Sequence, residues 1–552
     1  MDARDALFIQ LEHILKDEDA WSEDEMRSKV AADTPPVEGR HLTVYTVRKE
    51  KLARVVQRLV REEGFRILSA VMEDERDRIG HFVLSVVVWR EGSMHLLVLS
   101  ALLDAHDPTY PAITPHVPMM NWYEREHRDL FGVEPLGHPQ PYPLILHAPA
   151  PEGMFPMRRD ARSEGVYPRV SSDIPSNGFV QYEGGEVSLV PVGPIHAGII
   201  EPGHFLFGTV GEPIVHLDVR LFYTHRGIEK AAEDLHYSEA IQIAERTCGV
   251  CTYSHALAYS LAIERLGAVE VSERATVLRT VLAELERLVN HIGDIGNMCA
   301  GFGYHRGVAD GARLKERLLQ LNERRFKHRY LRGVVRPGGL LVDLDPAGKA
   351  DIEATLRALE DDFFELMERL AKHEIAQDRL RSTGRLGAEI VRDLCVVGPA
   401  ARASGISYDV RVARPYLAYA RPDVLERMRK TRMPLVRTEG DAYARMMVRA
   451  AEAEQSLAII RYLLEHLPEG EIQVPLPKLP AYTVGCVTIE SPRGELVVWI
   501  RLDEAERIRR LKIRSATYHN WPAVPYAVVG NILADFPLIN KSFELCYACC
   551  DR

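Results

Sequence analysis

Two pairs of cysteines with C-x-x-C spacing place the strongest constraint on how this chain can fold. Cys248 and Cys251 form the first pair, and Cys546 and Cys549 form the second, close to the end of the 552 residues. Each pair can give two thiolates to one metal ion, so each is half of a four-thiolate site. The pairs lie roughly 300 residues apart, whereas those of a local zinc ribbon lie within about 15 to 20. A shared site would therefore have to be assembled by the tertiary fold of a large domain.

The spacing alone leaves other interpretations open. A single C-x-x-C is equally compatible with zinc, with redox chemistry or with coincidence, and a buried structural zinc is the simplest alternative for both pairs together. Three further cysteines, Cys299, Cys395 and Cys486, are isolated and are expected to be small buried apolar residues. Eight cysteines in a chain of this length are too few for a disulfide scaffold.

Charge and hydropathy exclude several classes of protein. The 69 basic and 79 acidic residues give a net charge of −10, so no global field attracts nucleic acid or anionic lipid. The N-terminus, M-D-A-R-D, lacks the basic start of a signal peptide. Apolar runs such as 81–89 and 95–103 are shorter than the roughly 18 to 20 residues of a membrane-spanning helix. We expect a cytoplasmic protein whose membrane association comes through partners.

The pattern of apolar residues predicts two domains. Between residues 43 and 103 they alternate or form short runs, with a helical segment at 51–63, which predicts a small α+β domain containing a sheet. A polar stretch at 171–177 predicts a linker. We therefore place the first domain at residues 1–175.

The second domain, residues 176–552, has a different character. Long segments with apolar residues at helical spacing lie at 272–297, 349–380 and 440–467, and strands are expected near 187–219 and 482–502. We expect a mainly α-helical domain built around a helix bundle.

The sequence around the cysteine pairs resembles that of nickel-iron hydrogenase large subunits. Residues 245–255, E-R-T-C-G-V-C-T-Y-S-H, resemble the R-x-C-G-x-C-x-x-x-H element of that family, and residues 542–549, S-F-E-L-C-Y-A-C, resemble its C-terminal D-P-C-x-x-C element. Two further elements stand in the expected order, G-P-I-H-A-G-I-I-E-P-G-H at 193–204 and E-S-P-R-G at 490–494. The resemblance covers nearly the whole second domain.

The first domain resembles a different protein, the 30-kDa-type subunit of respiratory complex I. This resemblance rests on E-R-E-H-R-D-L-F-G at 124–132 and R-R-D at 158–160. Its fusion to a hydrogenase large subunit is characteristic of group 4 membrane-associated enzymes of the formate hydrogenlyase type. Residues 223–230 and 336–339 also resemble the complex I 49-kDa-type subunit, which lacks the thiolate pairs. The resemblance implies that residues 1–175 are a docking domain and that 176–552 are catalytic.

The resemblance also implies a metal centre. It makes Cys248 and Cys546 terminal ligands of nickel, and Cys251 and Cys549 bridges from nickel to an iron that carries cyanide and carbon monoxide. Soft thiolate ligands suit these metals. The activity implied is the interconversion of dihydrogen with two protons and two electrons by heterolytic cleavage.

Heterolytic cleavage requires a base near the metals. By resemblance, Glu201 relays protons from the Cys546 sulfur, and Arg493 holds its guanidinium over the open face of the metals. His255 would donate a hydrogen bond to a bridging sulfur. The residues alone also allow an ordinary strand-end carboxylate, a solvent-facing arginine and a core histidine with structural hydrogen bonds.

Two departures from the family pattern stand at the C-terminus. Glu544 and Leu545 occupy the positions of the usual Asp-Pro, and Cys550 is an extra thiol beside a ligand, which we expect to be a bystander. The chain stops three residues after Cys549, where precursors of this family are cut by a maturation protease after metal insertion. We therefore expect the sequence to be the mature form.

The isolated cysteines cannot bind an iron-sulfur cluster, so electrons must leave through a partner. The resemblance implies that this partner is a small subunit with a four-iron four-sulfur cluster. Further iron-sulfur and membrane subunits of a complex I-like assembly would hold the chain on the inner face of the cell membrane. One alternative is a non-catalytic, complex I-like quinone-module or scaffold subunit with a structural or vestigial metal site. The other is a hydrogen-sensing relative.

Overall fold

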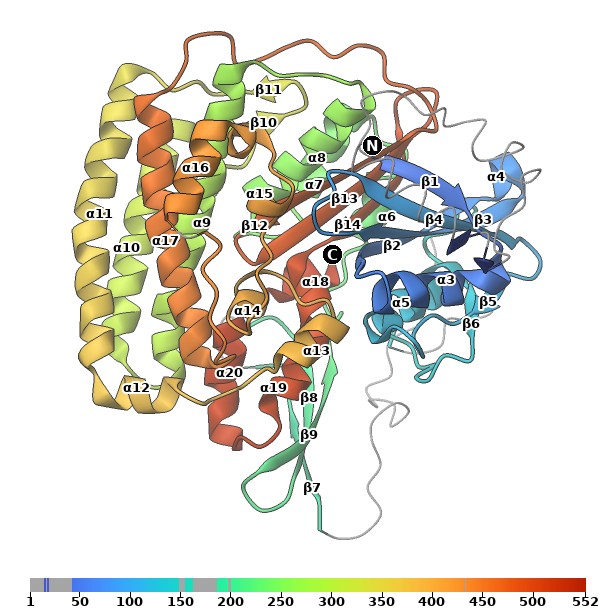
Figure 1. Ribbon diagram of the computed structural model, residues 1–552, viewed down its shortest axis with the longest axis horizontal. Coiled ribbons are helices and arrows are strands. Elements are labelled where there is room, and N and C mark those ends of the chain that lie inside the picture. Colours follow the sequence, from blue (N-terminus) through green and yellow to red (C-terminus); the bar gives the residue numbers. More distant parts are fainter. Residues whose placement is uncertain are drawn as a thin grey trace.

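The computed structural model describes residues 14, 15, 17, 18, 42–147, 154–161, 186–196, 200–431 and 433–552. The predicted linker at 171–177 and the domain boundary at residue 175 lie outside these residues. A smaller region rich in strands, from the first part of the chain, lies beside a larger region in which long helices stand side by side (Figure 1).

The N-terminal region is built on a mixed sheet with the strand order β1-β4-β3-β2. Its strands are β1 (Leu42–Thr46), β2 (Arg66–Glu75), β3 (His81–Trp89) and β4 (Leu96–Asp104). Strands β2 and β3 are buried along almost their whole length, because the sheet is covered on both faces. Helix α3 (Lys49–Arg61) places Leu52, Val55 and Leu59 in the core. This arrangement agrees with the α+β pattern and the helix at 51–63 that the sequence predicts.

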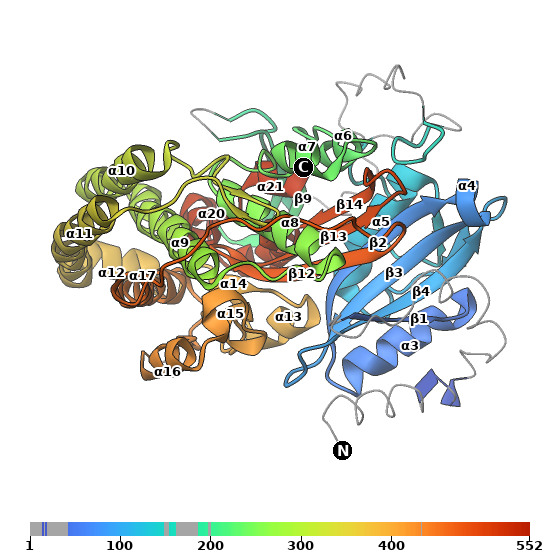
Figure 2. The ribbon, with the colours of Figure 1, turned by 90° about the horizontal axis from the view of Figure 1, so that it is seen from above.

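Long helices dominate the second region, as the apolar spacing predicts (Figures 1 and 2). They are α9 (Glu273–Gly301), α10 (His305–Phe326), α11 (Pro346–Lys372) and α17 (Ala442–Glu465). Helices α9 and α10 cross closely at two glycines: a Cβ atom on Gly296 would lie 2.9 Å from the Cα atom of Gly311. The stretch 349–380, predicted as one helix, is divided into α11 and α12 (Glu374–Leu380). The break falls at His373, whose backbone is extended and whose Nδ1 accepts a hydrogen bond from the amide of Ala376.

Two antiparallel sheets accompany the helices. Strands β7 (Ser188–Val192), β8 (His204–Thr209) and β9 (Ile214–Arg220) form an arm at one end of the molecule (Figure 1). Strands β12 (Val484–Ser491), β13 (Gly494–Leu502) and β14 (Ile508–Arg514) form a buried sheet.

Shorter elements complete the chain. Those of the N-terminal region are α4 (Arg76–Ile79), β5 (Thr109–Pro111), η1 (Pro118–Met120), α5 (Asn121–Phe131) and β6 (Glu134–Leu136). Those between β9 and β12 are α6 (Ile228–Ala232), α7 (Tyr237–Ala244), α8 (Thr252–Leu266), β10 (Val335–Arg336), β11 (Gly339–Leu340), α13 (Ala388–Asp393), α14 (Gly398–Arg402), α15 (Val410–Ala413), η2 (Leu417–Ala420) and α16 (Pro422–Lys430). The C-terminal ones are α18 (Ala516–Asn520), η3 (Trp521–Ala523), α19 (Val524–Val528), η4 (Leu533–Asp535), α20 (Phe536–Phe543) and α21 (Tyr547–Asp551).

A buried interface joins the two regions along β2. Glu73 of β2 accepts two hydrogen bonds from Arg501 of β13, at 2.8 and 3.0 Å. Arg514 of β14 donates to the carbonyl oxygen of Leu68 at 2.6 Å. Apolar residues of β2, β3 and β4 also belong to the same core cluster as helices α8 and α9. The N-terminal sheet is thus packed directly against the strands that carry one side of the candidate site.

Among the residues described, every helix is too short or too polar to cross a membrane.

Candidate metal centre

The first cysteine pair lies at the start of helix α8. Cys251 is the residue that precedes the helix, and its partner Cys248 lies three residues earlier in the loop that leads into it. Glu286 of α9 accepts hydrogen bonds from the amides of Tyr253 and Ser254, at 2.7 and 3.0 Å. These amides belong to the first turn of α8, which has no intrahelical acceptors for them. A carboxylate from a neighbouring helix therefore fixes the position of the first pair.

The second pair lies in the short passage from helix α20 to helix α21. Cys546 is the residue that precedes α21, and Cys549 lies within it. The carbonyl oxygen of Cys549 accepts a hydrogen bond from the hydroxyl of Ser515 at 2.9 Å. Glu544, just after α20, has left-handed backbone geometry with a φ of 52°. This residue redirects the chain so that the second pair faces the first.

The four sulfur atoms converge, although the sequence separates them widely. The Sγ atoms of Cys248 and Cys546 lie 3.5 Å apart, and those of Cys251 and Cys549 lie 3.2 Å apart. All four are free thiols, since a disulfide would need about 2.05 Å. Two sulfurs bound to one metal at about 2.3 Å can lie at such separations. Cys546 is partly exposed and the other three are buried, so the donor set fits a soft metal with one accessible side.

The pKa values of the thiols are shifted in opposite directions. Hydrogen bonds from Cys248 and Cys549 lower the pKa of Cys251 below its usual value. The pKa of Cys546 is raised, chiefly by its hydrogen bond with Cys248. Because a metal binds thiolates, occupation of this site must release protons.

His255 lies one helical turn after Cys251. Its Nε2 lies 3.5 Å from the sulfur of Cys549, and the side chain is 1% exposed. Burial lowers the pKa of His255 to about 4, so the ring is neutral at physiological pH. A neutral ring that carries its proton on Nε2 can donate to the Cys549 sulfur.

Arg493 lies in the turn between β12 and β13 and is buried. Its guanidinium donates to Asp294 Oδ1 at 3.1 Å, to the carbonyl oxygen of Glu544 at 2.6 Å and to Asn290 Oδ1. Burial alone would lower the pKa of Arg493, but the charges of Asp294 and Cys251 raise it above its usual value. The residue is therefore a fixed cation beside the sulfurs, and the solvent-facing interpretation is wrong.

Glu201 lies beside the second cysteine pair. Its Oε2 accepts a hydrogen bond from the amide of Ala548 at 2.7 Å. Burial, and then the charge of Cys546, raise its pKa above the usual value. Glu201, Cys248, Cys546 and Arg493 all line one cavity of about 670 Å³. This cavity connects the accessible side of the centre with the surface.

Helix α9 contributes functional residues that the sequence analysis missed. Glu286, Asn290 and Asp294 recur every four residues, which places them on one face of the helix. Glu286 fixes α8, while the other two bind Arg493. The available signal was a row of polar residues at four-residue spacing, although α9 also carries charged residues such as Arg287 at other positions.

The other cysteines lie apart from this centre. Cys299 and Cys486 are buried in one hydrophobic cluster and Cys395 in another, as the sequence predicts. Cys550 is fully buried in the hydrophobic cluster that contains Cys395. The group of candidate ligands formed by Cys248, Cys546 and Cys549 does not include it.

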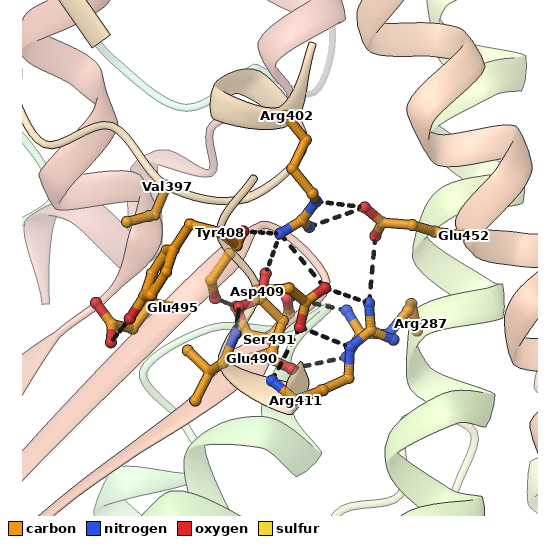
Figure 3. Close-up of polar contacts among 12 residues, drawn as sticks. Arg287, Val397, Arg402, Tyr408, Asp409, Arg411, Glu452, Glu490, Ser491 and Glu495 are labelled. Atoms are coloured by element: carbon orange, nitrogen blue, oxygen red, sulfur yellow. Dashed lines mark hydrogen bonds and ion pairs between the residues drawn. The ribbon is translucent and has the colours of Figure 1, made fainter. Parts of the chain in front are cut away.

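A network of buried ion pairs surrounds Glu490, at the end of β12 (Figure 3). We call it the arginine network; its members are Glu284, Arg287, Arg402, Asp409, Arg411, Glu452 and Glu490. Arg402 pairs with Glu452 at 2.8 Å and with Glu490 at 2.9 Å. Arg287 donates to the carbonyl oxygens of Glu490 and Ser491, at 2.7 and 3.1 Å. The end of β12 is thus fixed two residues before Arg493.

Comparisons with known proteins point to two kinds of relative. The family model described as "Respiratory-chain NADH dehydrogenase, 30 Kd subunit" matches residues 45–167, and that of the 49 Kd subunit matches 303–483 and 476–552. The model described as "Nickel-dependent hydrogenase" matches residues 226–294. The chain therefore has a 30-kDa-like region followed by a 49-kDa-like region.

Curated relatives resemble the chain over most of its length. Hydrogenase-4 component G of Escherichia coli (strain K12) is 33% identical over 92% of this chain and 87% of its own. Formate hydrogenlyase subunit 5 of the same organism is 33% identical over 93% and 89%. The carbon monoxide-induced hydrogenase of Rhodospirillum rubrum is 32% identical over 66% of this chain and 99% of its own.

Proposed function

We infer the function from the family to which the chain belongs, that of the large subunits of membrane-bound nickel-dependent hydrogenases related to complex I. The chain is the catalytic subunit of a hydrogenase, an oxidoreductase that interconverts dihydrogen with two protons and two electrons. The observation that carries this conclusion for the chain itself is the convergence of four cysteine sulfurs from the two ends of the second region. A scaffold role would not require four free thiols around one accessible point.

The group that would occupy this site is nickel with an iron that carries cyanide and carbon monoxide. Cys248 and Cys546 would hold the nickel, and Cys251 and Cys549 would hold both metals. Support comes from the close approach within each of these two sulfur pairs and from the match to nickel-dependent hydrogenases. When bound, the centre supplies the electrophilic site for heterolytic cleavage of dihydrogen and accepts the electrons.

Glu201 moves the proton between the Cys546 sulfur and the cavity. Its raised pKa brings the carboxyl closer to the range in which it can both accept and release a proton near neutral pH. The hydrogen bond from Ala548 fixes one carboxylate oxygen. The side chain also lines the cavity that leads to the surface, which gives the proton a route to solvent.

Arg493 and His255 set the electrostatics of the centre. Arg493 is a permanent cation held by three acceptors, so its guanidinium is oriented before substrate arrives. With the centre bound, it would polarise dihydrogen and would donate hydrogen bonds to the cyanide ligands. His255 donates to the sulfur of Cys549 and so reduces the negative charge on that bridge.

Electrons leave through a partner. Apart from the four ligands, the cysteines are too scattered to hold a cluster among the described residues. The proposed acceptor is a small subunit with a four-iron four-sulfur cluster, and further iron-sulfur and membrane subunits complete the assembly. Residues 1–175 act as a docking domain and 176–552 as the catalytic domain. The partner subunits place the chain peripherally on the inner face of the cell membrane, and a maturation protease processes its precursor.

The test is a pair of adjacent cysteine variants in the native assembly, assayed for hydrogen evolution from a reduced dye. Cys549→Ser removes a bridging ligand and should abolish turnover. Cys550→Ser changes the next thiol, which lies in the hydrophobic core, and should retain most of it. Equal activity of the two variants would contradict the assignment of the ligands. Absence of turnover from the unaltered assembly would favour the scaffold alternative.

A further inference from the structure

The end of helix α20 leads directly into the ligand Cys546. The last carbonyl oxygens of a helix have no intrahelical donors and form the negative end of its dipole. Here three consecutive carbonyl oxygens accept hydrogen bonds from two buried guanidinium groups. Arg449 donates to those of Ser542 and Phe543, at 2.8 and 3.0 Å, and Arg493 donates to that of Glu544 at 2.6 Å.

Asp294 joins these two arginines. Its Oδ1 lies 3.1 Å from Nη2 of Arg493, and its Oδ2 lies 3.4 Å from Nε of Arg449. Arg449 belongs to α17 and Asp294 to α9, so the contacts attach the end of α20 to the two longest helices around it. Arg445, one turn before Arg449, donates to the hydroxyl of Ser542 at 2.9 Å. We call Arg449 and Asp294 the α20 clamp.

The backbone between Phe543 and Cys546 needs such external support. The intervening residues are Glu544 and Leu545, and neither is a proline that would fix its own φ. Glu544 is held at a φ of 52°, a left-handed conformation that a residue with a Cβ atom rarely adopts without support. Hydrogen bonds to the carbonyl oxygens on both sides of this turn supply that support.

We propose that Arg449 and Asp294 are positioning residues that hold the C-terminal cysteine pair in register with the first pair. Bound carbonyl oxygens at Ser542 and Phe543 fix the direction in which the chain leaves α20. The sulfur of Cys546 then stays 3.5 Å from that of Cys248. The claim that the clamp positions metal ligands rests on the proposed function. The claim that the clamp makes the segment rigid does not.

The variant Arg449→Met in the complete assembly tests the clamp by hydrogen-deuterium exchange and infrared spectroscopy. We expect the amides of residues 544–552 to exchange at least tenfold faster, because their anchoring is lost. In the metal-loaded enzyme the carbon monoxide band should shift and broaden, since the sulfurs are less well ordered. Arg449→Lys keeps one donor and should give an intermediate exchange rate.

The control is Arg461→Met, the same substitution on the same helix. Arg461 pairs with Glu360 at the partly exposed side of α17 and should leave both readouts unchanged. Asp294→Asn provides a second variant of similar shape if Arg449→Met fails to fold; it should shift the band and accelerate exchange at 544–552. Exchange rates equal to those of the unaltered chain in Arg449→Lys and Asp294→Asn would overturn the proposal. The carbon monoxide band could instead be missing from the unaltered chain and from every variant, while exchange is still accelerated in the variants. That result would overturn the metal assignment and leave the clamp in place.

Discussion

The arginine network and the metal centre both bury charged side chains, but only one of them borders open space. In the arginine network, guanidinium groups and carboxylates from α9, α14, α17, β12 and the start of α15 pair with one another, and the side chains of Arg402 and Glu490 are fully enclosed. At the metal centre, similar groups line a cavity of about 670 Å³ together with the sulfurs. The same residue types therefore fix the backbone in one region and can exchange protons in the other.

The titration behaviour of the two regions follows this difference. Burial raises the pKa of Glu490 in the network to about 7, and the charge of Asp409 adds to the effect. Both carboxylate oxygens of Glu490 accept hydrogen bonds, one from Arg402 and one from the amide of Val410. The pKa of Glu201 is also raised by burial, but this carboxylate lines the cavity. Access to water, more than the pKa, therefore distinguishes Glu201 from Glu490.

Breaking the network should have the largest effect on stability. Arg402→Met leaves Glu452 and Glu490 without their shared cation, so the free energy of unfolding should fall by about 3 to 5 kcal/mol. Urea unfolding of the purified chain would measure this. Arg437→Met, at a partly exposed pair with Glu439, is the control and should cost less than about 1 kcal/mol. Equal losses in the two variants would mean that the network does not support the fold.

Changing Arg493 should affect turnover more than folding. Arg493→Lys keeps the charge but cannot reach Asn290, Asp294 and the Glu544 carbonyl together. The turnover number should fall by about 10²- to 10³-fold, as for loss of an oriented electrostatic donor. The midpoint of thermal unfolding, measured on the same samples, should change far less than in Arg402→Met. Unaltered turnover would remove Arg493 from the catalytic set.

Changing Glu201 should impair proton transfer while leaving the stability of the fold almost unchanged. Glu201→Gln keeps an oxygen that accepts from the Ala548 amide but cannot carry a proton. Turnover should fall by about 10²-fold, with unfolding free energy within about 0.5 kcal/mol of the unaltered chain. Hydrogen evolution measured from pH 5 to 9 gives the second readout. A variant with the original rate and pH profile would show that another group moves the proton.

A smaller effect of pH should reveal how the first cysteine pair is supported. Burial raises the pKa of Glu286 to about 7 in the folded chain, above the usual value near 4.5. The folded state then binds the extra proton between these values, so stability falls as pH rises from about 4.5 to 7 and levels off above. Glu286→Gln should remove up to about 3 kcal/mol of this dependence, seen as a flatter plot of unfolding midpoint against pH. The exposed substitution Glu469→Gln should leave the slope unaltered.

The sequence points to the candidate metal ligands more readily than to the groups that hold them. The local spacing of Cys248 and Cys251, and of Cys546 and Cys549, indicates a set of ligands, and apolar periodicity indicates the long helices. The support of Arg493 by Asp294 joins a helix to a strand turn about 200 residues away, and no local pattern encodes such a pair. The break at His373 was missed for a related reason, because the apolar spacing continues through it while the side chain caps the next helix.

Infrared spectroscopy with metal analysis of the native assembly decides whether the four cysteines hold a nickel-iron centre. We expect nickel and iron near one each per chain, together with stretching bands of cyanide and carbon monoxide. Zinc alone, or no metal, with no such bands would contradict this assignment, and the four converging sulfurs would then have to be a structural site.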